Sequence, residues 1–176
     1  QKNDASLFAF GTHSKKRPHN LVLGRTFDGK ILDMFELGIR SAASMFSFAS
    51  GGRGASAESK PCLLFEGPDW EHVPRLVQLR SLLTDFFRQQ DVPAISPLGI
   101  DRVLVFAAPD AEYSAAAAGG DAAPPPTILL RHYAVALRRS AEGTAPYTAL
   151  AEVGPRLNLE LRRVQTPADD LMKAAM

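Results

Sequence analysis

The chain has 176 residues, of which 45% are hydrophobic and 22% are charged, so its composition is that of one globular domain or of two small lobes sharing a core. Its formal net charge is only +1, so its overall charge does not indicate a nucleic-acid-binding protein, and no apolar run is long enough for a membrane span. A single cysteine, Cys62, excludes an internal disulfide and a cysteine-rich zinc site.

The first half of the chain predicts three strands and one long helix. Dense apolar and β-favouring residues indicate the strands. The strands are expected at residues 6–10 and 20–25 and, as a short buried strand opened by Cys62, at residues 62–66. Leucines at steps of three and four predict a helix over residues 71–88, with Pro74 accommodated in its first turn. Residues 31–39 fit a helix and a strand equally well.

The second half of the chain predicts mostly strands. Two runs are apolar on both faces, as strands inside a sheet are, and in a third run leucines alternate with polar residues. These strands are expected at residues 102–107, 127–138 and 157–162. A short helix is expected from Pro167, with Thr166 as its N-cap, so each half is of the α/β type. Residues 50–60 and 110–126 are rich in small residues and predict flexible surface insertions.

No motif in the chain predicts catalysis. Residues 24–30 satisfy the G-x-x-x-x-G-K pattern of a phosphate-binding loop, but Ile31 follows where magnesium needs Ser or Thr, and Asp28 would repel phosphates. We interpret this segment as a glycine turn that leaves a strand. The four histidines have no metal-ligand spacing, and the apolar run around His132 indicates a histidine inside the sheet. We therefore expect no enzyme activity, no metal and no cofactor.

Positive charge is concentrated in one segment. Residues 1–30 carry six Lys or Arg against two Asp, a net charge of +4, so the rest of the chain carries −3. The centre of this charge is GTHSKKRPHN at residues 11–20, which is either a solvated loop tip or a grip on phosphate. Hydroxyl and backbone donors beside the cations favour the grip, and the lack of aromatic residues argues against stacking of bases. The candidate binding residues are His13, Lys15, Lys16, Arg17, Asn20 and Arg25.

A second short motif is EVGPR at residues 152–156. Gly154 and Pro155 indicate a turn or bulge between two strands, and we favour this structural interpretation. A positive charge held at that corner by Arg156 would either bind an acidic partner or cap a sheet edge.

Four stretches of the sequence resemble the Brix domain, and together they span almost the whole chain outside the two insertions. The most specific is AEVGPRLNLELRRVQTP at residues 151–167, in which GPR precedes alternating apolar residues. The others lie at residues 11–39, 60–67 (KPCLLFEG) and 79–88 (LRSLLTDFFR). The stretch KKRPHNLVLGRTFDGKILDM narrows the resemblance to one member, a factor of large-subunit assembly.

The resemblance implies an α/β (α+β) fold of two pseudo-symmetric halves, about residues 1–97 and 98–176, with helices on mixed sheets as in anticodon-binding domains. It implies a non-catalytic ribosome biogenesis factor of the nucleolus and nucleus. The implied partners are a regulator of ribosome synthesis protein in an obligate heterodimer, 5S and large-subunit ribosomal RNA, and the ribosomal proteins of the 5S ribonucleoprotein. The chain would recruit that ribonucleoprotein to the large-subunit precursor.

Two sets of residues are carried over from the resemblance. The basic strip named above matches the RNA surface, and Gly154, Pro155 and Arg156 match the family signature. A protein-docking scaffold with little direct RNA binding is the alternative.

Overall fold

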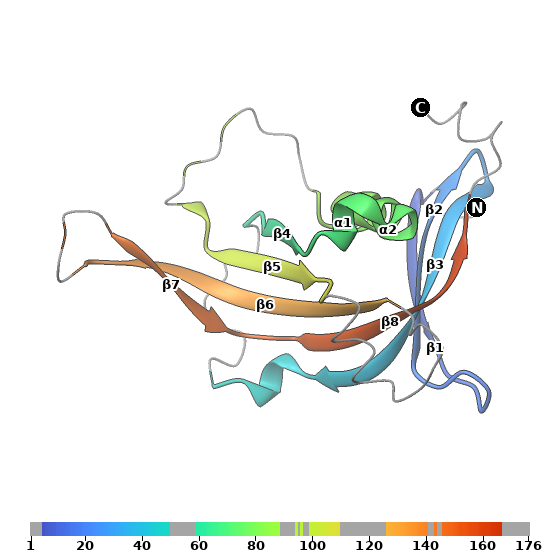
Figure 1. Cartoon of the computed structure of the whole chain (residues 1–176), viewed down its shortest axis with the longest axis horizontal. Helices are drawn as coiled ribbons and strands as arrows, with labels where there is room; N and C mark the ends of the chain where they lie inside the picture. The colour runs from blue at the N-terminus through green and yellow to red at the C-terminus, as the bar shows by residue number, and fades with distance from the viewer. Residues whose placement is uncertain are drawn as a thin grey trace.

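The computed structural model describes residues 5–49, 59–88, 94, 96, 99–109, 126–140, 143 and 146–166. These residues form one mixed sheet of eight strands, which bends near its middle and carries two helices on one face (Figure 1). The α/β class expected from the sequence is confirmed. The insertions predicted at residues 50–60 and 110–126 lie mostly outside the described residues, and the helix predicted from Pro167 lies wholly outside them.

The sheet has the order β1-β2-β3-β8-β6-β5-β4, and β7 pairs with β6 beyond the end of β8. The strands are β1 (Leu7–Thr12), β2 (Asn20–Phe27), β3 (Lys30–Ala43), β4 (Cys62–Glu66), β5 (Arg102–Ala107), β6 (Thr127–Arg138), β7 (Tyr147–Glu152) and β8 (Arg156–Gln165). The helices are α1 (Asp69–His72) and α2 (Pro74–Phe87), with a 3-10 turn, η1 (Met45–Ser47). Among the described pairs, β4 and β5 alone run parallel.

The ambiguous segment at residues 31–39 belongs to the long strand β3. It pairs on both edges, since Phe35 lies opposite Leu23 of β2 and opposite Val164 of β8. The segment is a strand because the neighbouring strands β2 and β8 satisfy the backbone hydrogen-bonding groups of β3, and the local sequence pattern does not contain this information. β-bulges at Glu36/Leu37 and Ile39/Ser41 interrupt the β3–β8 register, and such bulges bend a sheet.

The apparent phosphate-binding loop at residues 24–30 is a β-hairpin. Its tip is Asp28-Gly29, with φ angles of 49° and 69°, and Phe27 pairs with Lys30 across it. Two successive positive φ angles are typical of a type I′ turn, which matches the twist of the flanking strands. A second strand follows the second glycine instead of a helix, so the interpretation of this segment as a glycine turn that leaves a strand is confirmed.

The single helix predicted over residues 71–88 is wrong at its start. α1 ends at His72, and Val73 is extended, with φ −91° and ψ 110°, before α2 begins at Pro74. Proline disfavours the helical conformation of the residue before it, but it fits the first position of a new helix. The proline therefore divides the helical segment in two.

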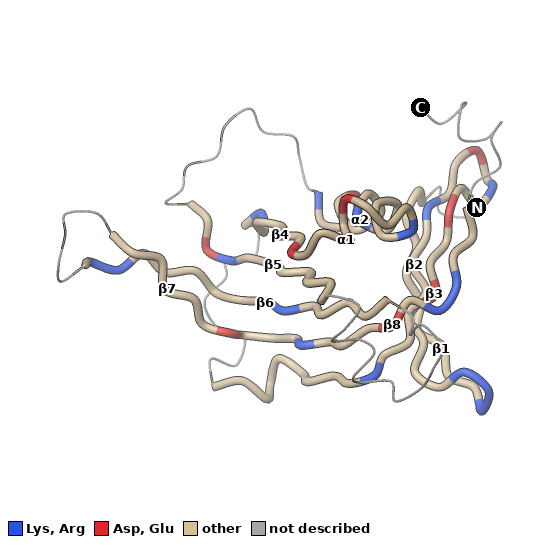
Figure 2. Tube along the Cα trace, viewed as in Figure 1, with Lys and Arg blue, Asp and Glu red and all other residues tan. Residues whose placement is uncertain are grey.

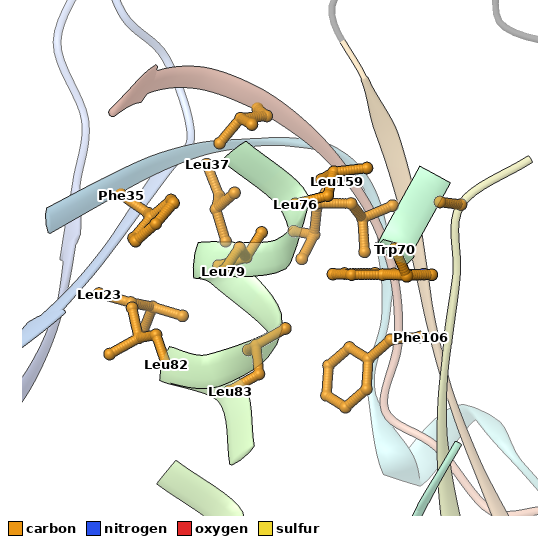
Figure 3. Packing of buried hydrophobic residues seen from close by; sticks show 13 residues of the cluster. Leu23, Phe35, Leu37, Trp70, Leu76, Leu79, Leu82, Leu83, Phe106 and Leu159 are labelled. Atoms are coloured by element: carbon orange, nitrogen blue, oxygen red, sulfur yellow. The ribbon is translucent and has the colours of Figure 1, made fainter. Parts of the chain in front are cut away.

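The hydrophobic core lies between α2 and the bend of the sheet (Figure 3). From α2 it contains Leu76, Leu79 and Leu82, each fully buried. The sheet supplies side chains from strands far apart in sequence, namely Leu23, Phe35, Leu37, Phe106, Ile128, Leu159 and Leu161. Trp70 of α1 meets Phe65 of β4 edge-on, with ring centroids 5.0 Å apart. The helix thus fastens the two halves of the chain to one core.

The prediction that residues 62–66 form a buried strand is wrong in one respect. β4 is a strand, but it lies at the end of the sheet, and Cys62 is exposed. Leu63 and Phe65 face the core, whereas Leu64 is 49% exposed on the other face. A short apolar run cannot show whether both of its faces are covered.

Candidate nucleic-acid interface

The basic stretch at residues 13–19 is the tip of the β1–β2 hairpin, which closes at the Thr12–Asn20 pair. A tight turn forms the tip, because the backbone amides of Ser14 and Arg17 each donate to the carbonyl of the other at 3.1 Å. His19 has a positive φ of 52° and donates its amide to His13 Nδ1 at 3.3 Å. These local bonds give the tip a defined shape.

Arg17 turns back from the tip onto the sheet. Its Nη1 donates to Glu36 Oε2 at 3.1 Å, and Asn20 Nδ2 donates to Glu36 Oε1 at 2.9 Å. Arg162 of β8 donates to Asn20 Oδ1 and, at 3.0 Å, to the carbonyl of Pro18. Glu36 and Asn20 are buried, so each of these polar groups needs its partners. We call Arg17, Asn20, Glu36 and Arg162 the tip network.

A glycine makes room for the tip network. A Cβ added at Gly38 would lie 2.2 Å from Arg162 Nε, so a larger residue would displace the guanidinium. Sequence reasoning missed Gly38, Glu36 and Arg162, because Arg162 lies 142 residues from Asn20 along the chain. No local pattern could have joined them.

Lys15 and Lys16 remain as the free cations of the tip. Both are exposed, and neither has an acidic partner among the described residues. Figure 2 shows Lys and Arg, in blue, at the hairpin tip, which projects beyond the body of the sheet. Side-by-side cations without counter-charges form a local site of positive potential.

The structure places Arg25 away from the tip. Its guanidinium lies on the helix face, where Nε donates to Asp33 at 3.0 Å and Nη1 donates to Asp85 of α2 at 2.6 Å and to Ser81 at 3.0 Å. The hydrogen bond to Asp33 raises the pKa of Arg25 above its ordinary value, and the bond to Asp85 adds to this. Arg25 therefore ties α2 to the β2–β3 hairpin and is not grouped with the cations of the tip.

The GPR motif forms the turn between β7 and β8, as its glycine and proline predict. Gly154 has a φ of +67°, and an added Cβ would lie 2.4 Å from Phe48 Cε2, so glycine is needed there for two reasons. Its carbonyl accepts a hydrogen bond from His132 Nδ1 at 2.6 Å. His132 is thus a half-buried sheet histidine, as the sequence indicated.

Arg156 is held within the chain. Nε donates to Glu152 Oε1 at 2.8 Å, and the guanidinium lies over the ring of Phe48, 5.4 Å from its centroid. The hydrogen bond from Arg156 lowers the pKa of Glu152. Of the two roles considered for this arginine, the geometry favours fixing the corner of the sheet over binding an acidic partner.

The described part of the chain contains no group of three His, Cys, Asp or Glu side chains placed to hold a metal ion. Within that same part, no helix has the length and apolar character needed to cross a membrane. The features that stand out are a basic hairpin tip and a glycine-proline corner, both held by contacts between residues far apart in the sequence.

Comparison with known protein families agrees with these features. Residues 1–163 match the family described as the Brix domain. The chain belongs to the Brix domain family. The match includes the basic hairpin, α2 and the GPR turn, so the structural elements described above are those of a Brix domain.

Curated relatives of this Brix domain carry the name "Ribosome production factor 2 homolog", the member that the basic stretch suggested. The protein from Drosophila melanogaster is 40% identical over 99% of the chain, and that from Homo sapiens is 39% identical over 100%. The protein from Arabidopsis thaliana is 38% identical over 100% of the chain. The chain spans 49%, 52% and 52% of the Drosophila, human and Arabidopsis proteins, about half of each.

Proposed function

We propose that this Brix domain acts in ribosome production by binding ribosomal RNA through the β1–β2 hairpin tip. Together with a regulator of ribosome synthesis protein as an obligate partner, it would recruit the 5S ribonucleoprotein to the large-subunit precursor in the nucleolus. The proposal gives the domain no chemistry of its own. The names of the relatives support the process, and the exposed Lys15–Lys16 pair supports the mode of binding.

The pairing of Arg17 with Glu36 sharpens the expected number of phosphate contacts. Three adjacent cations would neutralise up to three phosphates, but Arg17 already has a carboxylate partner and its side chain is only 40% exposed. We therefore assign the phosphate contacts to Lys15 and Lys16. His13 and Asn20 shape the tip, because their side-chain atoms are engaged within the hairpin and the tip network.

The salt dependence of RNA affinity tests this assignment. Binding of the chain to a 5S ribosomal RNA transcript would be measured by fluorescence anisotropy over a series of salt concentrations. The double variant Lys15→Glu/Lys16→Glu should lower the slope of log affinity against log salt by roughly 2, because each phosphate contact contributes about 0.9 on a duplex. Arg17→Gln should lower the slope by less than either lysine does.

The control carries the same change in charge at a distance from the tip. Lys30 lies in the β2–β3 turn and Arg75 on the exposed side of α2. Lys30→Glu/Arg75→Glu should leave the slope close to that of the wild type, because these cations are not proposed to meet RNA. Equal slopes for the two double variants would overturn the assignment, and absence of salt-dependent binding by the wild type would overturn RNA binding itself.

A second candidate function, protein docking, is favoured by apolar side chains on one face of the sheet. Seven apolar side chains on β4 to β7 face away from α2, and the Glu152–Arg156 ion pair borders them beside Tyr133. We call these seven side chains the open sheet face, and they are Leu64, Val103, Val105, Tyr133, Val135, Leu137 and Leu150. Arg131, opposite Val105, lies on the same side of the sheet. Leu64, Leu137 and Leu150 are 49%, 41% and 56% exposed. Exposed apolar side chains gathered on one face and bordered by charged residues are typical of interaction sites.

We propose that the partner protein covers the open sheet face. Leu150→Glu would place a charge at the most exposed residue of the open sheet face and should weaken partner binding at least tenfold in isothermal titration, while RNA binding by the hairpin tip stays unchanged. Val77→Glu is the matched control, because Val77 is 43% exposed on α2 and lies outside the open sheet face. Unchanged partner affinity in Leu150→Glu would refute this site.

A further inference from the structure

A second basic projection lies at the other end of the sheet. Beyond the end of β5, strands β6 and β7 continue as a two-stranded ribbon, with Leu137 opposite Thr148 and Arg138 opposite Tyr147. Lys and Arg colour the outer end of this ribbon, and the β1–β2 tip lies at the opposite end of the long axis of the molecule (Figure 2). The ribbon thus projects as the first tip does.

The end of the ribbon carries two adjacent arginines, Arg138 and Arg139, both exposed. Neither guanidinium has an acidic partner among the described residues. Over residues 135–151 the sequence has these two arginines against one glutamate, Glu142, which lies outside the described residues. Two described acids lie at the base of the ribbon: Glu152, which is paired with Arg156, and Asp101, whose backbone carbonyl accepts from the amide of Val135. The end of the ribbon is therefore a local excess of positive charge.

An exposed phenol ring lies beside Arg138, whereas the rings within the first tip are the imidazoles of His13 and His19. Tyr147 is 51% exposed and is the cross-strand partner of Arg138, so the two side chains leave the same face of the ribbon. This face is not the open sheet face, whose residues Leu137 and Leu150 alternate with Arg138 and Tyr147 along the strands. A guanidinium next to an exposed ring is the combination that binds unpaired nucleotides, with phosphate on the cation and a base stacked on the ring.

We propose that the end of the β6–β7 ribbon is a second RNA-binding site, specific for unpaired nucleotides, in which Arg138 and Arg139 contact phosphates and Tyr147 stacks a base. The proposal rests on the RNA-binding function assigned to the hairpin tip and extends it. The two sites differ in chemistry, since the rings at the Lys15–Lys16 tip are the paired imidazoles of His13 and His19, whereas the ribbon has an exposed phenol ring beside its cations. A single RNA that meets both ends would be held along the length of the sheet.

The test uses the whole chain with two probes, an unstructured 20-nucleotide oligouridylate and a 5S ribosomal RNA transcript. Arg138→Glu/Arg139→Glu should lower the salt slope on oligouridylate by roughly 1.4, because each contact to a single strand contributes about 0.7. Tyr147→Ala should weaken oligouridylate binding roughly 5- to 150-fold with an unchanged slope, and Tyr147→Phe should restore it, because stacking needs the ring alone. Circular dichroism would confirm that each variant is folded.

A charge-matched control, the hairpin-tip variant and a measurement of partner affinity separate this site from the hairpin tip and from a protein contact. Lys30→Glu/Arg75→Glu matches the change in charge and should leave the slope on oligouridylate unchanged. If Lys15→Glu/Lys16→Glu lowers the slope on 5S ribosomal RNA but the ribbon variants behave as the control on both probes, the second site is refuted and the first stands. If the ribbon variants lose partner affinity and no RNA affinity, the ribbon is a protein contact and the proposal fails. If the wild type binds neither probe, both RNA proposals fail together.

Discussion

Replacing Arg25 tests whether this cation holds the fold or binds RNA. In the structure its guanidinium joins Asp33 of β3 to Asp85 of α2, and the side chain of Asp33 is only 6% exposed. Arg25→Met keeps the length of the apolar stem but removes the charge, so the carboxylate of Asp33 is left buried without its partner. Breaking a buried pair in this way costs about 3–5 kcal/mol.

The expected loss can be measured by urea unfolding followed through the fluorescence of Trp70, which is the single tryptophan and is 1% exposed. A loss of that size corresponds to a fall in melting temperature of roughly 6–20 °C, because a domain of this length loses about 2–4 °C per kcal/mol. The denaturant slope should stay constant, since the same surface is exposed on unfolding.

Two companion variants define the origin of the loss. Asp85→Asn should cost no more than about 1 kcal/mol, because the side chain of Asp85 is 34% exposed and its ion pair is partly solvated. Arg25→Met/Asp33→Leu should recover at least half of the loss, because no buried charge is left unpaired and Asp85, which also loses its partner, is 34% exposed to solvent. The reasoning would be refuted if Arg25→Met cost less than about 1 kcal/mol, or if the folded variant lost one unit of RNA salt slope, since one phosphate contact contributes about 0.9.

Three further substitutions probe the core, the tip network and the GPR corner. Leu79→Ala should destabilise the chain by about 2–5 kcal/mol in urea unfolding, because Leu79 is fully buried between α2 and the sheet, and a loss under 1 kcal/mol would contradict that packing. Gly38→Ala should push Arg162 off the hairpin, weakening RNA binding with an unchanged salt slope, and a reduced slope would instead make Arg162 a phosphate ligand. Glu152→Gln should lose the ion pair with Arg156. Because the pKa of Glu152 is lowered in the fold, the stability that this pair contributes is present above about pH 4.5 and lost as the pH falls further. A stability difference from the wild type that persists at pH 2 would argue against this pair.

Local patterns were sufficient wherever one strand or turn could be judged by itself. The runs at residues 102–107 and 127–138 are strands with the predicted bounds, and the GPR motif is the predicted turn. Local patterns were insufficient where the pairing of a segment with strands distant in the sequence determined its structure. Residues 31–39 became a strand because β2 and β8 cover both edges of β3, and β4 became an edge strand because nothing described pairs beyond it. The break at Val73 is an exception. The local sequence contains the reason for it, because Pro74 disfavours a helical conformation at Val73, but the helical spacing of the leucines predicted one continuous helix.

Among the candidate binding residues, the sequence alone determined that cations gather in one turn between two strands, because charge and strand propensity are local properties. Only the tertiary structure decided which of those cations are free. In a count of charges, Lys15, Lys16, Arg17 and Arg25 each contribute one positive charge. In the fold, however, Arg17 is paired with Glu36 of β3, and Arg25 is paired with Asp33 of β3 and Asp85 of α2. Ion pairing depends on which carboxylate folding places within reach, and that distance is set by packing across the whole chain.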